Sequence, residues 1–213
     1  MVKKIKTKSG FTLSEVLITL VIIGIIAALT IPVAISNHKK QDYVSRLKKV
    51  YSTLSQATNR IIAEEGNVTN WLRNLDDLYS RYLKYLNVVK ACGSGTGCFP
   101  QQNGTGTYKT LNGDNYSHNW DTYTDSRKFI LADGVQVFIE NNGFSSLCQG
   151  GDGDRCVRIL VDINGVKGPN QWGRDVFEFS LKNNGLYPNG CGSVSCSGVS
   201  CTCKVLRENA MNY

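Results

Sequence analysis

An uninterrupted apolar stretch near the N-terminus constrains this chain more than any other feature. Residues 16–35 include no charged side chain. Because roughly 20 apolar residues are enough to cross the hydrocarbon core of a bilayer as a helix, this run predicts a transmembrane helix. Four lysines precede the run, and cationic residues next to a span tend to stay on the cytoplasmic side. They are Lys3, Lys4, Lys6 and Lys8.

One acidic residue, Glu15, lies at the start of the apolar run. An ionisable side chain in lipid is costly unless another group pairs with it, so it marks a candidate functional site.

The segment Gly10-Phe11-Thr12-Leu13-Ser14-Glu15, between a short basic leader and the apolar run, resembles the N-terminal signal of type IV prepilins and type II secretion pseudopilins. The resemblance extends, less sharply, to about residue 60. It implies that a membrane peptidase cuts after Gly10 on the cytoplasmic side and methylates the amine of Phe11. It also implies that Glu15 meets the amine of a neighbouring subunit during filament assembly. Such a cut would leave the new amine of Phe11 and the Glu15 carboxylate as the only charges of an apolar helix, and an opposite charge offsets part of the desolvation cost. A Glu15 without a partner in its own chain would therefore favour association between subunits.

Two alternatives are an ordinary secretory signal and a plain membrane anchor. A secretory signal has a shorter apolar core and then a small-residue cleavage site, whereas this run is long and residues 34–36 form a poor site. A plain anchor would have no use for Glu15. We therefore expect a leader at 1–10, a transmembrane and assembly helix at 11–36, and a globular head at 37–213.

The sequence beyond Asn37 has the pattern of an amphipathic helix, which the head would include. Together with the apolar run it predicts one helix over residues 11–64, about 80 Å long at 1.5 Å per residue. Gly24 and Pro32 interrupt it, and a proline inside a helix removes a hydrogen bond and bends the axis. In the family that the signal resembles, a proline at this place marks a kink or a melted segment. The apolar stripe recurs every three or four residues and comprises Tyr43, Leu47, Val50, Tyr51, Leu54, Ala57, Ile61 and Ile62.

The second half of the chain shows four strand patterns. They cover residues 128–131, 134–140, 156–162 and 175–181, and the first two read as a hairpin around residues 132–134. Residues 68–90 have helical spacing, whereas 91–98 and 100–126 are expected to be loops, with Trp120 as an anchor to the core. Residues 204–207 add an edge strand or tie down the C-terminus. The predicted fold class is α+β, with a long N-terminal helix packed on an antiparallel sheet, which is pilin-like.

Eight cysteines lie beyond the apolar run. An even number in an exported domain indicates disulfides and an oxidising compartment. Zinc is the alternative, but the spacings lack the usual two-residue separation of zinc ligands. Spacing favours local pairs between Cys92 and Cys98 and between Cys148 and Cys156, and it leaves three possible pairings among Cys191, Cys196, Cys201 and Cys203.

The most site-like segment of the head is residues 162–175, which joins two strand patterns. Hard cations such as Ca²⁺ bind carboxylate and carbonyl oxygens on loops of this kind, and the candidate ligands are Asp162, Asn164 and Asp175. The segment is similar to one in some pilin-like proteins, and major pseudopilins hold calcium in a loop of the head. The alternative is a structural loop, because Asp, Asn, Gly and Pro are turn formers.

Composition narrows the function further. The formal net charge of +7 falls to +3 without the four leader lysines, so we expect no nucleic-acid partner, which would require a basic face. No HExxH, Gly-x-Ser-x-Gly or P-loop motif occurs in the sequence. We therefore expect a structural subunit and not an enzyme.

The resemblance implies where this subunit works and with which partners. A prepilin peptidase and methyltransferase would process it at the bacterial inner membrane. An assembly platform in that membrane would then polymerise it with other pilin-like subunits, and the head would lie in the periplasm or outside the cell. The alternative is a membrane-anchored, exported binding module that does not polymerise.

Overall fold

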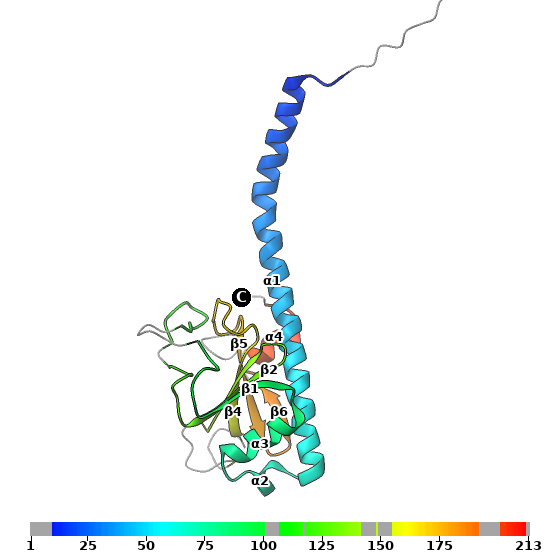
Figure 1. Ribbon diagram of the computed structural model, residues 1–213. Coiled ribbons are helices and arrows are strands. Elements are labelled where there is room, and N and C mark those ends of the chain that lie inside the picture. Colours follow the sequence, from blue (N-terminus) through cyan, green and yellow to red (C-terminus); the bar gives the residue numbers. More distant parts are fainter. Residues whose placement is uncertain are drawn as a thin grey trace, which may run out of the picture. The chain divides into compact units, whose positions relative to one another are not determined.

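The computed structural model describes residues 10–100, 107–116, 118–141, 148, 155–191 and 201–211. The chain divides into two units, Met1–Lys39 and Lys40–Tyr213, and helix α1 contributes to both. Four helices and six strands follow one another along the described residues (Figure 1). They are α1 (Leu13–Glu65), α2 (Val68–Trp71), α3 (Leu75–Tyr85), β1 (Val88–Gly93), β2 (Ser126–Leu131), β3 (Gln136–Glu140), β4 (Arg155–Asp162), β5 (Val176–Lys182), β6 (Gly185–Pro188) and α4 (Thr202–Glu208).

Helix α1 confirms the long N-terminal helix that the sequence predicts. It has 53 residues and continues on both sides of Pro32. It begins two residues later than expected because Thr12 caps it. The Thr12 hydroxyl accepts a hydrogen bond from the Glu15 backbone N–H at 3.2 Å, and the Glu15 carboxylate accepts one from the Thr12 backbone N–H at 2.8 Å. This reciprocal arrangement is a capping box, which satisfies two N–H groups at the helix start.

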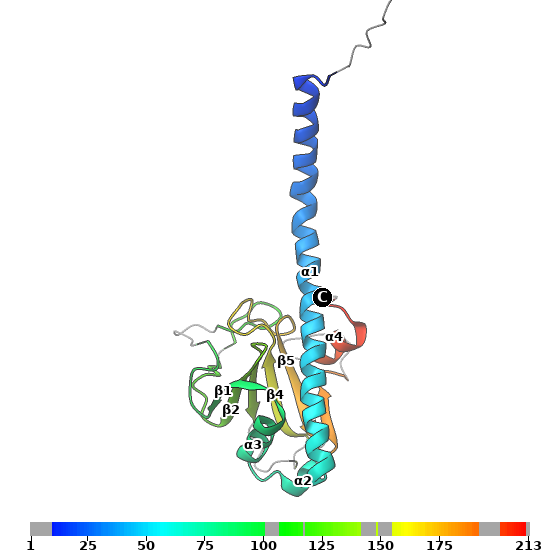
Figure 2. The same cartoon turned by 45° about the vertical axis from the view of Figure 1, so that its right-hand side comes forward.

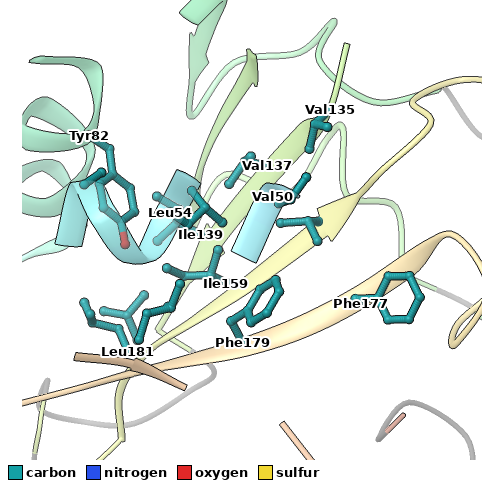
Figure 3. Close-up of a cluster of buried hydrophobic side chains, with 14 of the residues drawn as sticks. Val50, Leu54, Tyr82, Val135, Val137, Ile139, Ile159, Phe177, Phe179 and Leu181 are labelled. Carbon is teal, nitrogen blue, oxygen red and sulfur yellow. The ribbon is translucent and has the colours of Figure 1, made fainter. Parts of the chain in front are cut away.

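The amphipathic half of α1, from Lys40 onward, buries its apolar stripe against the sheet. Figure 3 shows Val50 and Leu54 beside the strand residues Ile139 and Ile159. Leu54 is fully buried, and burying one such side chain contributes roughly 1.5–3 kcal/mol. The buried residues of α1 are Val44, Leu47, Val50, Leu54, Ala57, Thr58 and Ile61.

The head contains a six-stranded antiparallel sheet with the strand order β1-β2-β3-β4-β5-β6. Each strand pairs with the next one in sequence, and the C-terminal half of α1 runs alongside the strands in both views (Figures 1 and 2). The α+β class, with the long helix packed on an antiparallel sheet, is therefore confirmed. The four strands expected from the sequence form the centre, β2 to β5.

The edges of the sheet differ from expectation. Strand β1 occupies residues that were expected to end a helical stretch and begin a loop, and β6 was not expected at all. The helical stretch itself forms α2 and α3, because Asn74 starts a new helix. Its side chain accepts from the Asp77 backbone N–H at 3.0 Å, and the Asp77 carboxylate accepts from the Asn74 backbone N–H at 3.1 Å.

The C-terminal segment is a helix and not an edge strand. Within α4, Val205 is fully buried in the core, and the Thr202 hydroxyl accepts a hydrogen bond from the Glu178 backbone N–H of β5 at 2.9 Å. The Cys203 backbone N–H donates to the Asn189 carbonyl at 2.9 Å. These contacts cover the part of β5 that lies beyond the short strand β6, so the segment ties down the C-terminus as the other reading of the sequence expected.

The second face of the sheet carries its own aromatic core. Phe138 of β3 and Leu160 of β4 are buried there under Tyr108, Trp120 and Trp172, which come from loops. Trp120 is 2% exposed, which confirms it as an anchor to the core, and its ring centroid lies 5.6 Å from that of Trp172. The sheet is thus covered on both faces, by α1 and α3 on one side and by loops on the other.

Candidate functional site

The residues of the N-terminal signal surround the start of α1. Phe11 is 89% exposed and lies just before the helix, next to Gly10, and Glu15 lies in the first turn. Glu15 forms no ion pair with a described residue, and its hydrogen-bond partner in its own chain is the uncharged Thr12. Its carboxylate accepts hydrogen bonds from both the backbone N–H and the hydroxyl of Thr12, at 2.8 and 2.9 Å. Any partner subunit must therefore share Glu15 with Thr12 or displace it.

The apolar run of α1 is exposed in the first unit except at Ala27, which is half-buried. Among the described residues, α1 is the one helix long and apolar enough to cross a membrane, and none of its most apolar 18-residue window is buried within the chain. An apolar surface of this size is stable only when lipid or another apolar surface covers it. The leader lysines Lys3, Lys4, Lys6 and Lys8 lie outside the described residues.

In the head, the structure brings Asp162 and Asp175 together from the two ends of one loop. Asp162 ends β4 and Asp175 directly precedes β5, and both side chains are 0% exposed. Asp162 accepts hydrogen bonds from the Tyr108 hydroxyl at 3.0 Å and from the Asn164 backbone N–H at 3.2 Å. Asp175 accepts from the backbone N–H groups of Asn170 at 2.8 Å and of the next residue at 2.6 Å. The two carboxylates thus hold the loop in one conformation.

Burial dominates the electrostatics of this pair. It raises the pKa of Asp162 well above its usual range, and the neighbouring charge of Asp175 raises it further. Burial also raises the pKa of Asp175, although hydrogen bonds from Gln171 and Asn170 oppose the rise. Desolvation disfavours the charged form of a carboxyl group. The pair therefore favours a bound positive charge, either a proton or a cation.

Two carboxamide oxygens of the same loop are buried without a hydrogen-bond partner. They are Oδ1 of Asn164 and Oδ1 of Asn170, and Asn170 is 7% exposed. Oxygen atoms of this kind are ligands that calcium accepts. Within the described ranges, no group of three or more His, Cys, Asp or Glu residues could hold a metal ion. A calcium ion here would depend on carboxamide and carbonyl oxygens to complete the coordination begun by Asp162 and Asp175.

Comparison with protein families accounts for most of the chain. A model described as the prokaryotic N-terminal methylation motif matches residues 5–31. A second model, described as a family of unknown function (DUF6613), matches residues 33–185. The chain belongs to the DUF6613 family. Searches of curated proteins and of solved structures found no match. The methylation motif confirms the resemblance to type IV prepilins and pseudopilins.

The two matches divide the candidate residues between them. The methylation motif includes Gly10, Phe11 and Glu15. The DUF6613 match includes the amphipathic half of α1, strands β1 to β5 and the whole of the loop at 162–175. Motif and apolar helix together are consistent with a membrane-anchored protein that crosses the membrane once.

Three disulfides join described residues in the head of this DUF6613 protein. They join Cys92 to Cys98, Cys148 to Cys156 and Cys191 to Cys203, and the first two are the local pairs that the spacing favours. The third, between Cys191 and Cys203, is one of the pairings that the spacing left open, and it links the chain after β6 to the first turn of α4. Cys201 is buried, and Cys196 lies outside the described residues.

A buried charge network on the second face of the sheet was missed in the sequence. Arg158 of β4 donates to the Glu140 carboxylate on β3 at 2.9 Å and to the Glu178 carboxylate on β5 at 2.8 Å. Arg155 reaches Glu178 at 3.1 Å. Burial raises the pKa of Glu140, against the lowering effect of Arg158. The alternation of charged and apolar residues along three adjacent strands could have indicated this network, but an outward face is usually read as solvated.

Proposed function

We propose that this chain is a structural subunit, a pilin or pseudopilin. A prepilin peptidase would process it between Gly10 and Phe11 and methylate the new amine, and the subunit would then assemble into a type IV pilus or a type II secretion pseudopilus. Its partners would be other pilin-like subunits and an assembly platform of the bacterial inner membrane. After export, the head would lie in the periplasm or outside the cell.

One observation carries the proposal, which is the methylation motif at residues 5–31 at the start of an exposed apolar helix. The motif is typical of structural, pilin-like proteins. A helix that is apolar all round suits lipid before assembly and suits neighbouring helices after it, because both are apolar surroundings. The chemistry is therefore performed on this chain, at its N-terminus, and not by it.

Mass spectrometry of the protein isolated from its native membrane tests the processing step. The expected product starts at an N-methylated Phe11. An intact Met1, or an N-terminus near Ser36, would overturn the proposal. Electron microscopy of sheared cell-surface and periplasmic fractions, with antibody labelling of the head, then tests assembly. A processed protein that stays monomeric in the membrane would favour the alternative, a membrane-anchored binding module.

We further propose that the loop at 162–175 binds calcium, with Asp162, Asn164 and Asp175 as ligands. The unpartnered oxygens of Asn164 and Asn170 beside two buried carboxylates favour this proposal over a purely structural loop. A bound Ca²⁺ would compensate the negative charge that burial makes unfavourable. The hydrogen bonds within the loop support the structural alternative.

Thermal unfolding of the full chain in detergent distinguishes these two readings. Millimolar CaCl₂ should raise the midpoint relative to a sample in chelator, because a ligand that binds only the folded state stabilises it. MgCl₂ at the same concentration controls for ionic strength. The double variant D162N/D175N should lose the response to calcium. An equal midpoint in CaCl₂ and in chelator for the wild type would support the structural loop instead.

A further inference from the structure

Gln136 of β3 lies directly opposite Asp162 of β4. The two residues are Cα partners in the antiparallel pairing of these strands. Side chains alternate between the two faces of a strand, and Phe138 and Leu160, each two residues away, both belong to the aromatic core of the second face. Gln136 and Asp162 therefore project from that same face as neighbours, and the Cβ atoms of such an opposed pair are about 5 Å apart.

The side chain of Gln136 reaches the loop that follows Asp162. A Cβ atom at Gly165 would lie 3.9 Å from both Cδ and Nε2 of Gln136, and 2.9 Å from the Gly134 carbonyl oxygen. The second distance is too short for a side chain, and the φ of Gly165 is +66°. A glycine at this position therefore lets the loop backbone pass close to the start of β3. The carboxamide of Gln136 thus lies against the loop at 162–175.

The oxygen of this carboxamide is buried without a hydrogen-bond partner. Gln136 is 3% exposed, and none of the described groups donates to its Oε1. The same is true of Oδ1 of Asn164 and Oδ1 of Asn170 on the loop itself. An unsatisfied buried acceptor costs free energy, so native structures contain few of them. Three such oxygens beside one pair of carboxylates point to a shared, positively charged ligand.

The charge of this carboxylate pair is not compensated by a side chain. Neither Asp162 nor Asp175 forms an ion pair with a cationic residue in the part of the chain that the structure describes. On the same face of the sheet, by contrast, Glu140 and Glu178 are both paired with Arg158. Buried charges are normally paired or bound to a metal ion. The pair at the loop therefore requires a proton or a bound cation.

A carboxamide oxygen from β3 suits the needs of calcium. Ca²⁺ takes roughly six to eight oxygen ligands, including the side-chain oxygens of Asn and Gln. The oxygens of Asp162 and Asp175 also accept hydrogen bonds within the head, so the two carboxylates need additional ligands beside them. Gln136 adds an oxygen without adding negative charge to a buried site. Its backbone is fixed between β2 and β4, so little ordering is required when an ion binds.

We infer that Gln136 is a calcium ligand through Oε1, and that the site spans β3 and the loop instead of the loop alone. The inference rests on the proposed calcium binding and deepens it, because a bound ion would then join β3 to the segment that follows β4. The competing explanation is a hydrogen bond from a protonated Asp162 carboxyl group to Oε1 of Gln136, which requires no metal ion.

Titration of the full chain in detergent with TbCl₃ tests the ligand directly. Tb³⁺ is a hard cation that binds oxygen ligands as Ca²⁺ does, and Tyr108, which donates to Asp162, lies where its ring can sensitise terbium luminescence. The luminescence decay in H₂O and in D₂O counts the water molecules on the ion. Q136L should hold about one more water than the wild type, because water replaces the lost oxygen. Competition with CaCl₂ should show calcium affinity weakened about tenfold or more.

Thermal unfolding separates a metal ligand from a hydrogen-bonding residue. In chelator, Q136L should be at least as stable as the wild type, because it removes an unsatisfied buried oxygen. Q136E should be less stable in chelator and should bind calcium more tightly than the wild type. A third carboxylate adds repulsion when the site holds no ion and adds ligand charge when it does.

The matched control is Q171L on the same loop. The Nε2 group of Gln171 donates to the carbonyls of Thr110 and Leu111, each at 3.0 Å. Loss of these hydrogen bonds should lower the unfolding midpoint both in calcium and in chelator. It should leave the number of waters on terbium unchanged, because this carboxamide binds the neighbouring loop and not the ion.

The possible outcomes are distinct. Equal water counts and equal calcium affinities for the wild type and Q136L would overturn the inference and leave calcium binding by the loop intact. An equal weakening in Q136L and Q171L would also overturn it, because both would then act by distorting the loop. A Q136L variant that is destabilised in chelator and unchanged toward terbium would indicate the hydrogen bond from protonated Asp162. A wild type that binds neither ion would overturn the proposed calcium site, and this inference with it.

Discussion

The ammonium group of Lys128 lies 2.8 Å from the main-chain oxygen of Asp121, and both side chains are buried. Lys128 also donates to the main-chain oxygens of Tyr123 at 2.9 Å and Ser94 at 3.3 Å. In return, the Asp121 carboxylate accepts from backbone N–H groups of the disulfide loop, including that of Cys98 at 3.0 Å. One cation and one anion thus fasten a long loop to β2.

Replacement of Lys128 by methionine should destabilise the head by about 3 kcal/mol, because it leaves buried carbonyl groups without a donor. Burial lowers the pKa of Lys128 because it removes the ammonium group from water. The hydrogen bonds to main-chain oxygens take the place of hydration. Urea denaturation of the full chain in detergent, followed by tryptophan fluorescence, measures the effect. Trp120 reports on this region.

The matched control is Lys90→Met in the adjacent strand β1. Lys90 donates a single hydrogen bond to the Gly97 carbonyl at 2.6 Å and is exposed. Solvent can replace this donor, so the same substitution should cost less than about 1 kcal/mol. If both variants lost equal stability, the special role of the buried ammonium group would be refuted.

Substitution of Arg158 should also destabilise the head by several kcal/mol, for a different reason. Its substitution by methionine leaves the Glu178 carboxylate buried, although Arg155 still reaches it, and leaves Glu140 without its cation. Breaking a buried pair from one side typically costs about 3–5 kcal/mol, whereas removing both charges costs less. We expect R158M to be less stable than R158M/E140Q. A double-mutant cycle by urea denaturation measures this coupling, and additive losses would contradict it.

Stability should depend on pH through Asp162. Burial raises its pKa in the folded chain, so the folded state holds this proton more tightly than the unfolded state. The contribution of Asp162 is therefore unfavourable above the folded pKa and becomes more favourable as pH falls toward about 4, the value of an unfolded aspartate. Relative to D162N, the wild type should gain stability as pH is lowered from neutral through that window. Denaturation of both at several pH values measures the gain.

A constant difference between the wild type and D162N over these pH values would mean that the Asp162 carboxyl titrates alike in both states. The series should be run in chelator so that calcium does not contribute.

Glu15 has two roles that substitution can separate. Glu15→Gln keeps an oxygen that can accept from Thr12 and so preserves the helix cap, whereas Glu15→Ala loses both cap and charge. If the charge serves assembly, both variants should be processed normally and both should fail to form filaments. Mass spectrometry of the N-terminus and electron microscopy give the two readouts. Normal filaments from E15Q, with none from E15A, would show that only the cap matters.

Much of the head could be predicted because its determinants are local. The stripe of α1 repeats every three to four residues, and the central strands alternate or run apolar for long enough to be recognised. The edge strand β1 could not be recognised, because Val88 and Val89 continue a helical spacing until pairing with β2 decides otherwise. Strand β6 and helix α4 are short, so packing on β5 outweighs their weak propensities.

The N-terminal motif, the apolar run and the amphipathic stripe were determined by the sequence alone, since each depends on residue types at fixed spacing along one helix. Tertiary structure decided the rest. It paired Asp162 with Asp175, placed Arg158 between Glu140 and Glu178, and set Lys128 beneath Asp121. These contacts depend on strand register and on loops that exclude water. Burial determines both the free energy lost when a charge is desolvated and the free energy gained from its partner. The spacing of residues along the chain does not encode burial, so no spacing rule could reveal these contacts.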